Sequence, residues 1–431
     1  MKKRSVIVHI GTEKTGTTSI QEFLSENRAG LDKFGIRYPS ALGPLNHFGL
    51  CALAQDEQPK YDTVRLLVGA GGRQWTTVAA VLERSFIKEM EELPDNIDKV
   101  LFSNEHLHSN LIERSEIVRL KAFLGRFFSS IKIVVYLRRQ DEVAHSLLST
   151  RVKGGETLDQ PVFPPVTGGL PYYFDYDAIT QNYETVFGLE NVIVRLFETS
   201  HLLKGDLIED FFGTCDLPNP STMRQVQRRN ESLSRTALML LSELNVYIPA
   251  YRHGQWNPIR NNLVETLENH CSGAAALCTR SEAKAFYEHC KATNERLQQR
   301  RFPALRGGLF STVFDRYPET LEQSSPPLKS ITEVVAHLWS AQREEFFDIL
   351  ERNRLLRFEL AKATKVPPEQ VEDLLRESIS MLPNRAALHA LYARWLAAHP
   401  SRKADALREA RRAQQLMPQY PEYKQLVIGL T

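Results

Sequence analysis

At 431 residues the chain is longer than one typical domain, so two or three domains are expected. Its hydrophobic content of 42% and its charged content of 25% are ordinary for a soluble globular protein. The formal net charge of +2 excludes the strong field that gathers nucleic acid. No apolar run approaches the roughly 20 residues that span a bilayer. We therefore expect neither a nucleic-acid partner nor a membrane span.

The first residues and the cysteines both favour a cytoplasmic protein. A basic start is followed by an apolar run, residues 6–10, that is too short for a signal peptide and is typical of a first strand. The five cysteines are odd in number and lack CxxC spacing, which favours free thiols in a reducing compartment. His270 and His289 lie near three of them in sequence, but the spacing fits no usual zinc pattern, so no metal is expected.

Short β-branched runs alternate with helical patterns through residues 1–215. Apolar residues at helical spacing indicate helices over residues 17–31 and 78–93. Residues 154–176, rich in Gly, Pro and aromatic side chains, are expected to form a long loop. The expected strands are continuously apolar, as in a parallel sheet covered on both faces, and lie at residues 5–10, 99–103, 131–137 and 191–197. The pattern predicts an α/β fold with a P-loop-like parallel sheet flanked by helices.

From Asn230 onward the strand signal disappears. Residues 216–323 are expected to be helical and to complete a first domain, residues 1–323, which ends in the run EQSSPP. Residues 324–431 are expected to form an all-α region. Within it, Leu-Pro at 382–383 recurs as Met-Pro at 417–418, a period close to the 34 residues of a tetratricopeptide unit. So short a repeat cannot bury a core alone, so it serves either as a helical cap or as a surface for a protein partner.

The strongest motif is VIVHIGTEKTGTTSIQ at residues 6–21. A buried strand leads into a glycine-containing loop, and a helix is expected to begin at its end. Backbone N–H groups in such a loop, ahead of a helix N-terminus, form a concave anion site. The candidate phosphate ligands are Lys14, Thr15, Gly16, Thr17, Thr18 and Ser19. Lys14 precedes the second glycine, whereas the usual nucleotide P-loop places its lysine directly after that glycine.

A second strand leads into a helix in IKIVVYLRRQDEVAHS, residues 131–146. Arg138 ends the strand, and Ser146 follows eight positions later. A guanidinium offers a planar fork to phosphate oxygens, and a hydroxyl adds a donor. The alternative is that Arg138 and Arg139 are ordinary surface charges. Two anion sites together suit a nucleotide that carries phosphate at two positions.

These motifs resemble those of PAPS-dependent sulfotransferases, especially bacterial ones, whose openings read HIG-x-x-KTGTTSIQ. The resemblance extends over residues 5–310 and includes SNE at 103–105, YLRR at 136–139 and NVIVRLF at 191–197. It implies transfer of a sulfuryl group from 3′-phosphoadenosine-5′-phosphosulfate (PAPS) to a hydroxyl acceptor, a saccharide or another small molecule, without a metal. The resemblance assigns the 5′-phosphosulfate to the Lys14 loop and the 3′-phosphate to Arg138 and Ser146. The late Arg-Lys-Gly loop of many animal members has no clear copy, and residues 306–308 (RGG) are the nearest candidate.

Such a reaction needs a donor for the leaving phosphate and a base for the acceptor hydroxyl. Lys14 is expected to meet the charge on the leaving phosphate. Glu105 is the first candidate base because it follows a strand end, where ligands of open α/β sheets gather. His47 is the second candidate and His106 the third. The competing interpretations are a solvated loop carboxylate for Glu105 and a structural histidine for His47.

Two other functions fit parts of the pattern. A P-loop kinase of a small molecule would place its lysine after Gly16 and would need a magnesium-binding aspartate at a strand end, which is not evident. A non-catalytic nucleotide-binding scaffold, whose tetratricopeptide-like tail recruits partners, is the third alternative.

Overall fold

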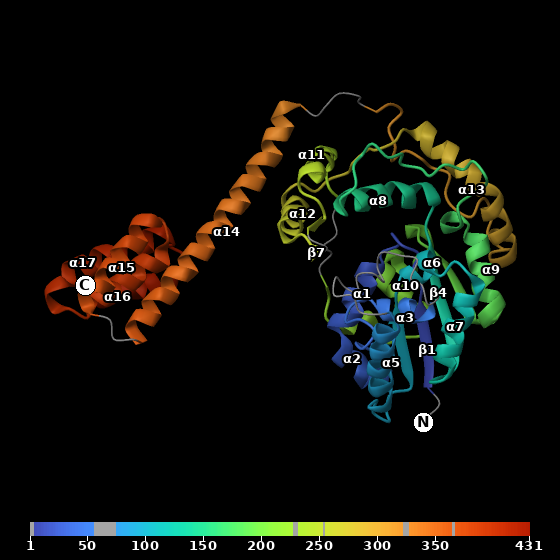
Figure 1. Cartoon of the computed structure of the whole chain (residues 1–431), viewed down its shortest axis with the longest axis horizontal. Coiled ribbons are helices and arrows are strands. Elements are labelled where there is room, and N and C mark those ends of the chain that lie inside the picture. The colour runs from blue at the N-terminus through green and yellow to red at the C-terminus, as the bar shows by residue number, and fades with distance from the viewer. Residues whose placement is uncertain (1–3, 56–74, 227–231, 253–254, 322–326, 364–366) are drawn as a thin grey trace. The chain divides into compact units, whose positions relative to one another are not determined.

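The computed structural model describes residues 4–55, 75–226, 232–252, 255–321, 327–363 and 367–431. The chain divides into two compact units, Met1–Ile331 and Thr332–Thr431, which Figure 1 colours along the chain. The expected domain boundary, between residues 323 and 324, lies outside the described residues. Among the helices of the described ranges, none has the length and apolarity needed to cross a membrane.

Five parallel strands form the central sheet of the first unit, in the order β2-β3-β1-β4-β5. They are β1 (Arg4–His9), β2 (Ile36–Arg37), β3 (Lys99–Ser103), β4 (Phe128–Leu137) and β5 (Val192–Leu196). Four of them are the strands that the sequence predicts. The fifth, β2, has two residues at the sheet edge, too few to give a periodic signal. The predicted α/β fold with a parallel sheet is confirmed.

Helices cover both faces of this sheet (Figure 1). Alternate strand side chains point to opposite faces, so Val8 and Phe102 enter one core and Ile7 and Leu101 the other. The first core is closed by α3 (Phe48–Ala54), α5 (Trp75–Glu91), α7 (Arg114–Gly125) and α9 (Tyr176–Phe187). The second is closed by α1 (Thr17–Glu26), α2 (Arg28–Lys33) and α10 (Leu207–Thr214). Because helices cover both faces of the sheet, consecutive strand residues such as Ile7 and Val8 are both apolar and buried.

The helix expected over residues 17–31 is two helices, because Asn27 interrupts it. The Asn27 side chain donates a hydrogen bond to the Phe23 carbonyl, 2.9 Å away, and its backbone leaves the helical region at φ −106°. A short amide side chain that competes for a helical carbonyl favours a helix end. α1 and α2 thus meet at an angle that the periodicity alone did not indicate.

Further helices complete the first unit. They are α6 (His106–Asn110), α8 (Gln140–Lys153), α11 (Arg235–Tyr247), α12 (Pro258–His270) and α13 (Arg280–Arg301). The expectation that no strand follows Asn230 was wrong in one place, where β6 (Tyr251–Arg252) and β7 (Gln255–Trp256) pair antiparallel. Two-residue strands leave no pattern in a sequence.

The second unit is helical, as expected. It contains α14 (Leu328–Ala363), which begins just before the unit boundary, and α15 (Pro368–Met381), α16 (Ala386–Ala397), α17 (Lys403–Leu416) and α18 (Pro421–Leu430). The pair α16 and α17 packs through small residues, including Ala390 and Ala413, which lets the two helices approach closely. The tetratricopeptide-like character of this pair stays a prediction.

Candidate active site

The loops that follow β1, β3 and β4 lie at one crevice of the sheet. The neighbours of β1 are β3 and β4, so the strand order reverses beside β1, and ligands of open α/β sheets bind at the carboxyl ends of strands at such a switch point. A cavity of about 790 Å³ lies there. The predicted residues that line it are Lys14, Gly16, Thr17, Thr18, Ser19, Glu105, His106, Arg138 and Ser146.

Two glycines allow the loop after β1 to turn into the cavity wall. Gly11 and Gly16 have φ of 96° and 74°, a region that favours glycine. A Cβ on Gly11 would come within 3.1 Å of Glu105, and one on Gly16 within 2.4 Å of the Leu207 side chain. The two positions therefore need glycine for conformation and for space.

Lys14 extends from this loop toward α8. Its φ of 65° is unusual for a residue with a side chain, and such strain concentrates at functional sites. Its ammonium donates a hydrogen bond to the Thr150 hydroxyl at 2.7 Å. Burial lowers the pKa of Lys14, and the positive charges of Lys153 and Arg138 lower it further. The lysine is thus held in an environment that favours an incoming negative charge.

Arg138 lies directly beside the Lys14 loop. Its Nη1 donates to the Lys14 carbonyl at 3.0 Å, and its Nε donates to Glu142 at 2.9 Å. Both predicted anion-binding regions therefore belong to one cavity, which Ser146 on α8 also lines. Had Lys14 and Arg138 been far apart, one nucleotide could not contact both.

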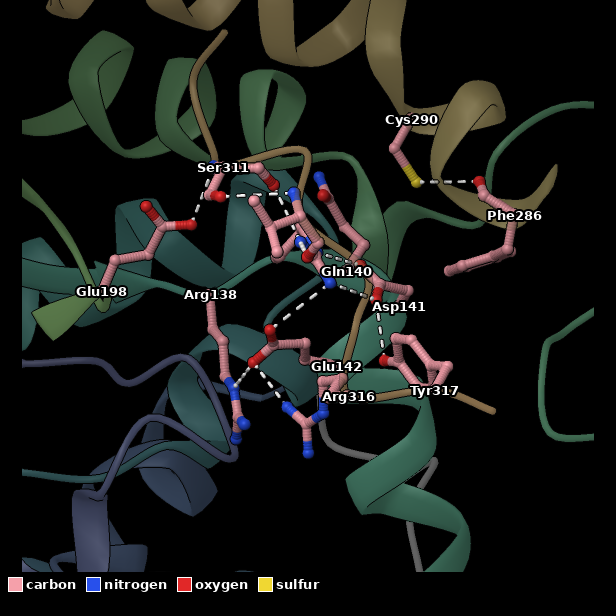
Figure 2. A network of polar contacts seen from close by, with 12 residues as sticks. Arg138, Gln140, Asp141, Glu142, Glu198, Phe286, Cys290, Ser311, Arg316 and Tyr317 are labelled. Atoms are coloured by element: carbon pink, nitrogen blue, oxygen red, sulfur yellow. Dashed lines mark hydrogen bonds and ion pairs between the residues drawn. The ribbon is translucent and has the colours of Figure 1, made fainter. Parts of the chain in front are cut away.

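A second arginine completes this side of the cavity, and the sequence analysis missed it. Figure 2 shows Arg138 and Arg316 converging on the Glu142 carboxylate, and Arg316 lies 2.9 Å from it. Burial opposes the ionisation of Glu142, but the arginines outweigh burial, and its pKa is lowered. The neighbouring Tyr317 hydroxyl donates to Asp141 at 2.7 Å and ties this segment to α8. The two guanidinium groups share one anion in the structure and could share another.

Glu105 lies at the opposite wall, at the end of β3. Gln21, on the buried side of α1, donates an amide hydrogen bond to Glu105 Oε2 at 2.6 Å. The same amide donates to the Ser103 hydroxyl at 3.3 Å. The carboxylate therefore has a fixed orientation, and Oε1 is left for other contacts. Gln21 ends the first motif, but its spacing alone did not point to this role.

Two predicted residues do not line the cavity. His47 is fully buried: its Nε2 contacts the Pro39 carbonyl at 2.9 Å, and its Nδ1 accepts from the Ser103 N–H at 3.1 Å. Burial lowers the pKa of His47 to about 4, so it is a neutral structural histidine here. Thr15 is also buried, and its hydroxyl donates to the Thr12 carbonyl at 2.6 Å.

His106, the third candidate base, does line the cavity and lies 3.8 Å from Glu13. The segment at residues 306–308 does not line it. Groups of His, Cys, Asp and Glu that could hold a metal ion are absent from the part of the chain that the structure describes.

The structure adds one stripe of α8 to the site. His145, Ser149, Thr150 and Lys153 line the cavity together with Ser146. Residues three, four and seven positions apart share a helix face, so this polar stripe was available in the sequence once Ser146 was chosen. Arg316 had no comparable signal, because it lies in an irregular segment remote from both motifs.

Comparisons with known proteins give limited similarity. No family model matches the chain. An uncharacterised protein from Archaeoglobus fulgidus is 26% identical over 203 residues, which is 47% of this chain and 53% of that protein. The chain therefore matches only about half the length of that relative. A crystal structure of a sulfotransferase from Alicyclobacillus acidocaldarius aligns with 71% of this chain and all of its own chain, with 16% identity and a TM-score of 0.37. Neither similarity assigns an activity.

Proposed function

We propose that this protein is a sulfotransferase that moves a sulfuryl group from PAPS to a hydroxyl acceptor, with a saccharide as the first class to test. The observation that supports this most strongly is the contact between the two predicted anion sites. Arg138 donates to the backbone of Lys14 at 3.0 Å, and both side chains line one cavity. A nucleotide with phosphate at its 3′ and 5′ positions needs two such sites at close range.

In this proposal the Lys14 loop holds the 5′-phosphosulfate. Thr17 and Thr18 line the cavity at the start of α1, where backbone N–H groups and hydroxyls suit phosphate oxygens. As the sulfur–oxygen bond to the 5′-phosphate breaks, negative charge grows on the leaving oxygen. The Lys14 ammonium donates to the Thr150 hydroxyl in the structure. In the reaction it would donate to the leaving phosphate oxygen instead and stabilise the charge there.

Arg138, Ser146 and Arg316 would hold the 3′-phosphate. The 3′-phosphate would take the place that Glu142 now fills between the two guanidinium groups, or would join it as a second anion. Because a bare 5′-phosphosulfate cannot make these contacts, this side of the cavity distinguishes PAPS from adenosine 5′-phosphosulfate.

Glu105 is the proposed base. The acceptor oxygen attacks sulfur in line with the leaving phosphate, and its proton passes to the free carboxylate oxygen of Glu105. The Gln21 hydrogen bond to the other oxygen supports this choice over His47, whose ring is engaged in the core. His106 stays the alternative base from the same wall of the cavity.

Radiolabelled PAPS and a panel of hydroxylated glycans and small molecules provide the test. We expect label transfer by the wild type, and a fall in kcat of about 10² to 10³-fold in Lys14→Ala, as for the loss of one transition-state donor. Lys33→Ala, an exposed lysine at the end of α2, is the matched control and should be unchanged. In Arg138→Ala, affinity should fall far more for PAPS than for adenosine 5′-phosphosulfate.

Three results would contradict the proposal. Turnover in Lys14→Ala at the wild-type rate would remove its catalytic role. Equal weakening of both nucleotides in Arg138→Ala would remove the 3′-phosphate site. Transfer from ATP with Mg²⁺, and none from PAPS, would favour a kinase.

A further inference from the structure

One face of α14 packs against other helices of the second unit, and its contacts identify the residues of that face. Phe358 belongs to the buried cluster formed with α15 and α16. Arg354 pairs with Glu377 of α15 at 3.3 Å, and Asp348 pairs with Arg385, just ahead of α16, at 2.7 Å. These contacts fix which side of the 36-residue helix is internal to the unit.

The opposite face carries large apolar side chains that the chain leaves exposed. Val335, Trp339, Phe346, Ile349 and Leu356 are between 48% and 68% exposed. Five such side chains along one helix face form a continuous stripe, unlike the single exposed apolar residues that any protein surface carries. A stripe of this kind marks an interaction surface.

The spacing of the stripe indicates another helix as its partner. From Val335 onward the steps alternate between four and three residues, and Gln342 and Asn353 occupy the two remaining positions before Leu356. This is the heptad seam of a coiled coil, with an average step of about 3.5 residues. A helix that packs on a flat or irregular surface needs no such regularity.

Two copies of the seam that run in opposite directions are complementary to each other. If two copies of α14 run antiparallel about a point between Phe346 and Ile349, Phe346 of each copy faces Ile349 of the other. The next layers pair Trp339 with Leu356 of the second copy, and Gln342 with Asn353 of the second copy. Apolar thus meets apolar, and the two polar positions meet each other.

The flanking charges match the same arrangement. Beside the seam, the exposed Glu345 of each copy faces the exposed Arg352 of the other, which gives two opposite-charge pairs. In a parallel pair, Arg352 would instead face Arg357 of the second copy, and the like charges would repel. The charges therefore favour the antiparallel pairing.

We propose that the protein is a homodimer in which α14 forms an antiparallel coiled coil with α14 of a second copy. The contact is isologous, so the same residues serve on both copies and the assembly closes at two. This inference does not depend on the proposed activity, since none of the seam residues lines the candidate active site.

Sedimentation and light scattering of the full chain test the dimer. We expect twice the monomer mass of 49.2 kDa at micromolar concentration, and the monomer for Phe346→Glu combined with Ile349→Glu, with the helical circular dichroism retained. Val246→Glu, at an exposed apolar position of the first unit, is the matched control and should stay dimeric. A wild-type protein that is monomeric at micromolar concentration overturns the proposal.

Charge reversal tests the orientation. Glu345→Arg and Arg352→Glu should each raise the dimer dissociation constant, and the double variant should restore it, because both pairs re-form with their charges exchanged. Oxidation should cross-link a Gln342→Cys and Asn353→Cys double variant between copies. Restoration that fails in the double charge variant, or cross-linking by Gln342→Cys alone, would overturn the antiparallel pairing.

Discussion

At the scale of single residues, the candidate site gathers charged side chains around one cavity. Arg138 donates a hydrogen bond to the backbone carbonyl of Lys14, although the two side chains carry like charges. The Lys14 ammonium donates to the Thr150 hydroxyl, and Arg138 donates to the Glu142 carboxylate. Across the cavity, Gln21 holds the Glu105 carboxylate. Because each of these contacts involves a single donor, single substitutions can separate binding from chemistry.

The first prediction concerns the contact that orients the proposed base. Gln21→Met keeps the size of the side chain but removes the donor, so Glu105 loses its fixed orientation. We expect kcat to fall by about 10 to 10²-fold, within the range of a placed base, and the acidic limb of kcat/KM to move to higher pH. Affinity for adenosine 3′,5′-bisphosphate, measured by calorimetry, should not change.

The control for this variant is Glu22→Gln, at the next position of α1, where the side chain does not line the cavity. It should match the wild type in rate and in pH profile. If Gln21→Met lowers the rate without any movement of the pH profile, Gln21 has only a packing role.

A second prediction follows from the charge on Lys14. In the proposed mechanism Lys14 must be protonated to meet the leaving phosphate, so activity should be lost as the pH rises through its pKa. Burial lowers that pKa, and the nearby charge of Lys153 lowers it further. Lys153→Met removes the neighbouring charge and should let the pKa of Lys14 rise. The basic limb of kcat/KM should then move to higher pH, and by less in high salt.

Arg151→Met is the matched control for this change. Arg151 is on the same helix but pairs with Glu156 and does not line the cavity. An equal shift of the basic limb in both variants would assign the effect to general surface charge.

At the scale of elements, the sequence predicted what depends on local pattern. Four of the five strands of the sheet and helix α5 follow from apolar periodicity, and the loop after β1 follows from its glycines. His47 lies in the core and not at the cavity. A histidine that packs in the core is indistinguishable in sequence from one that faces a ligand. Arg316 was missed because only the tertiary fold brings its segment to α8.

The turn that starts α1 gives a third prediction, on stability. Gly16→Ala places a Cβ in the left-handed region and against Leu207, 2.4 Å away. We expect a loss of about 1 to 3 kcal/mol of unfolding free energy and weaker nucleotide binding, since the loop must shift. Thermal and urea unfolding, with a bisphosphate titration, would measure both effects.

Gly30→Ala is the matched substitution, because Gly30 lies in helix α2 and a Cβ there meets nothing within 4 Å. Helix propensity alone predicts a gain of up to about 1 kcal/mol at that position. Equal effects of the two substitutions would mean that the loop after β1 relaxes freely and that its shape is not fixed by Gly16.

At the scale of the whole molecule, the candidate active site and the heptad seam lie in different units. Every described residue that lines the candidate active site belongs to Met1–Ile331, and every residue of the heptad seam, Val335 to Leu356, belongs to Thr332–Thr431. Each unit has its own buried clusters, and α14 begins at the junction. If both proposals hold, chemistry and assembly reside in different parts of the chain.

This separation can be tested by removing residues 328–431. The remaining chain keeps the sheet, its two helical layers and the full cavity wall, so we expect it to fold and to bind adenosine 3′,5′-bisphosphate as the full chain does. It should also be monomeric, since α14 is absent. Calorimetry and light scattering on the same preparation would measure both properties. A shortened chain that folds, by circular dichroism, but loses the bisphosphate would show that the second unit or a second copy contributes to the site, and a shortened chain that stays dimeric would place the dimer contact in the first unit.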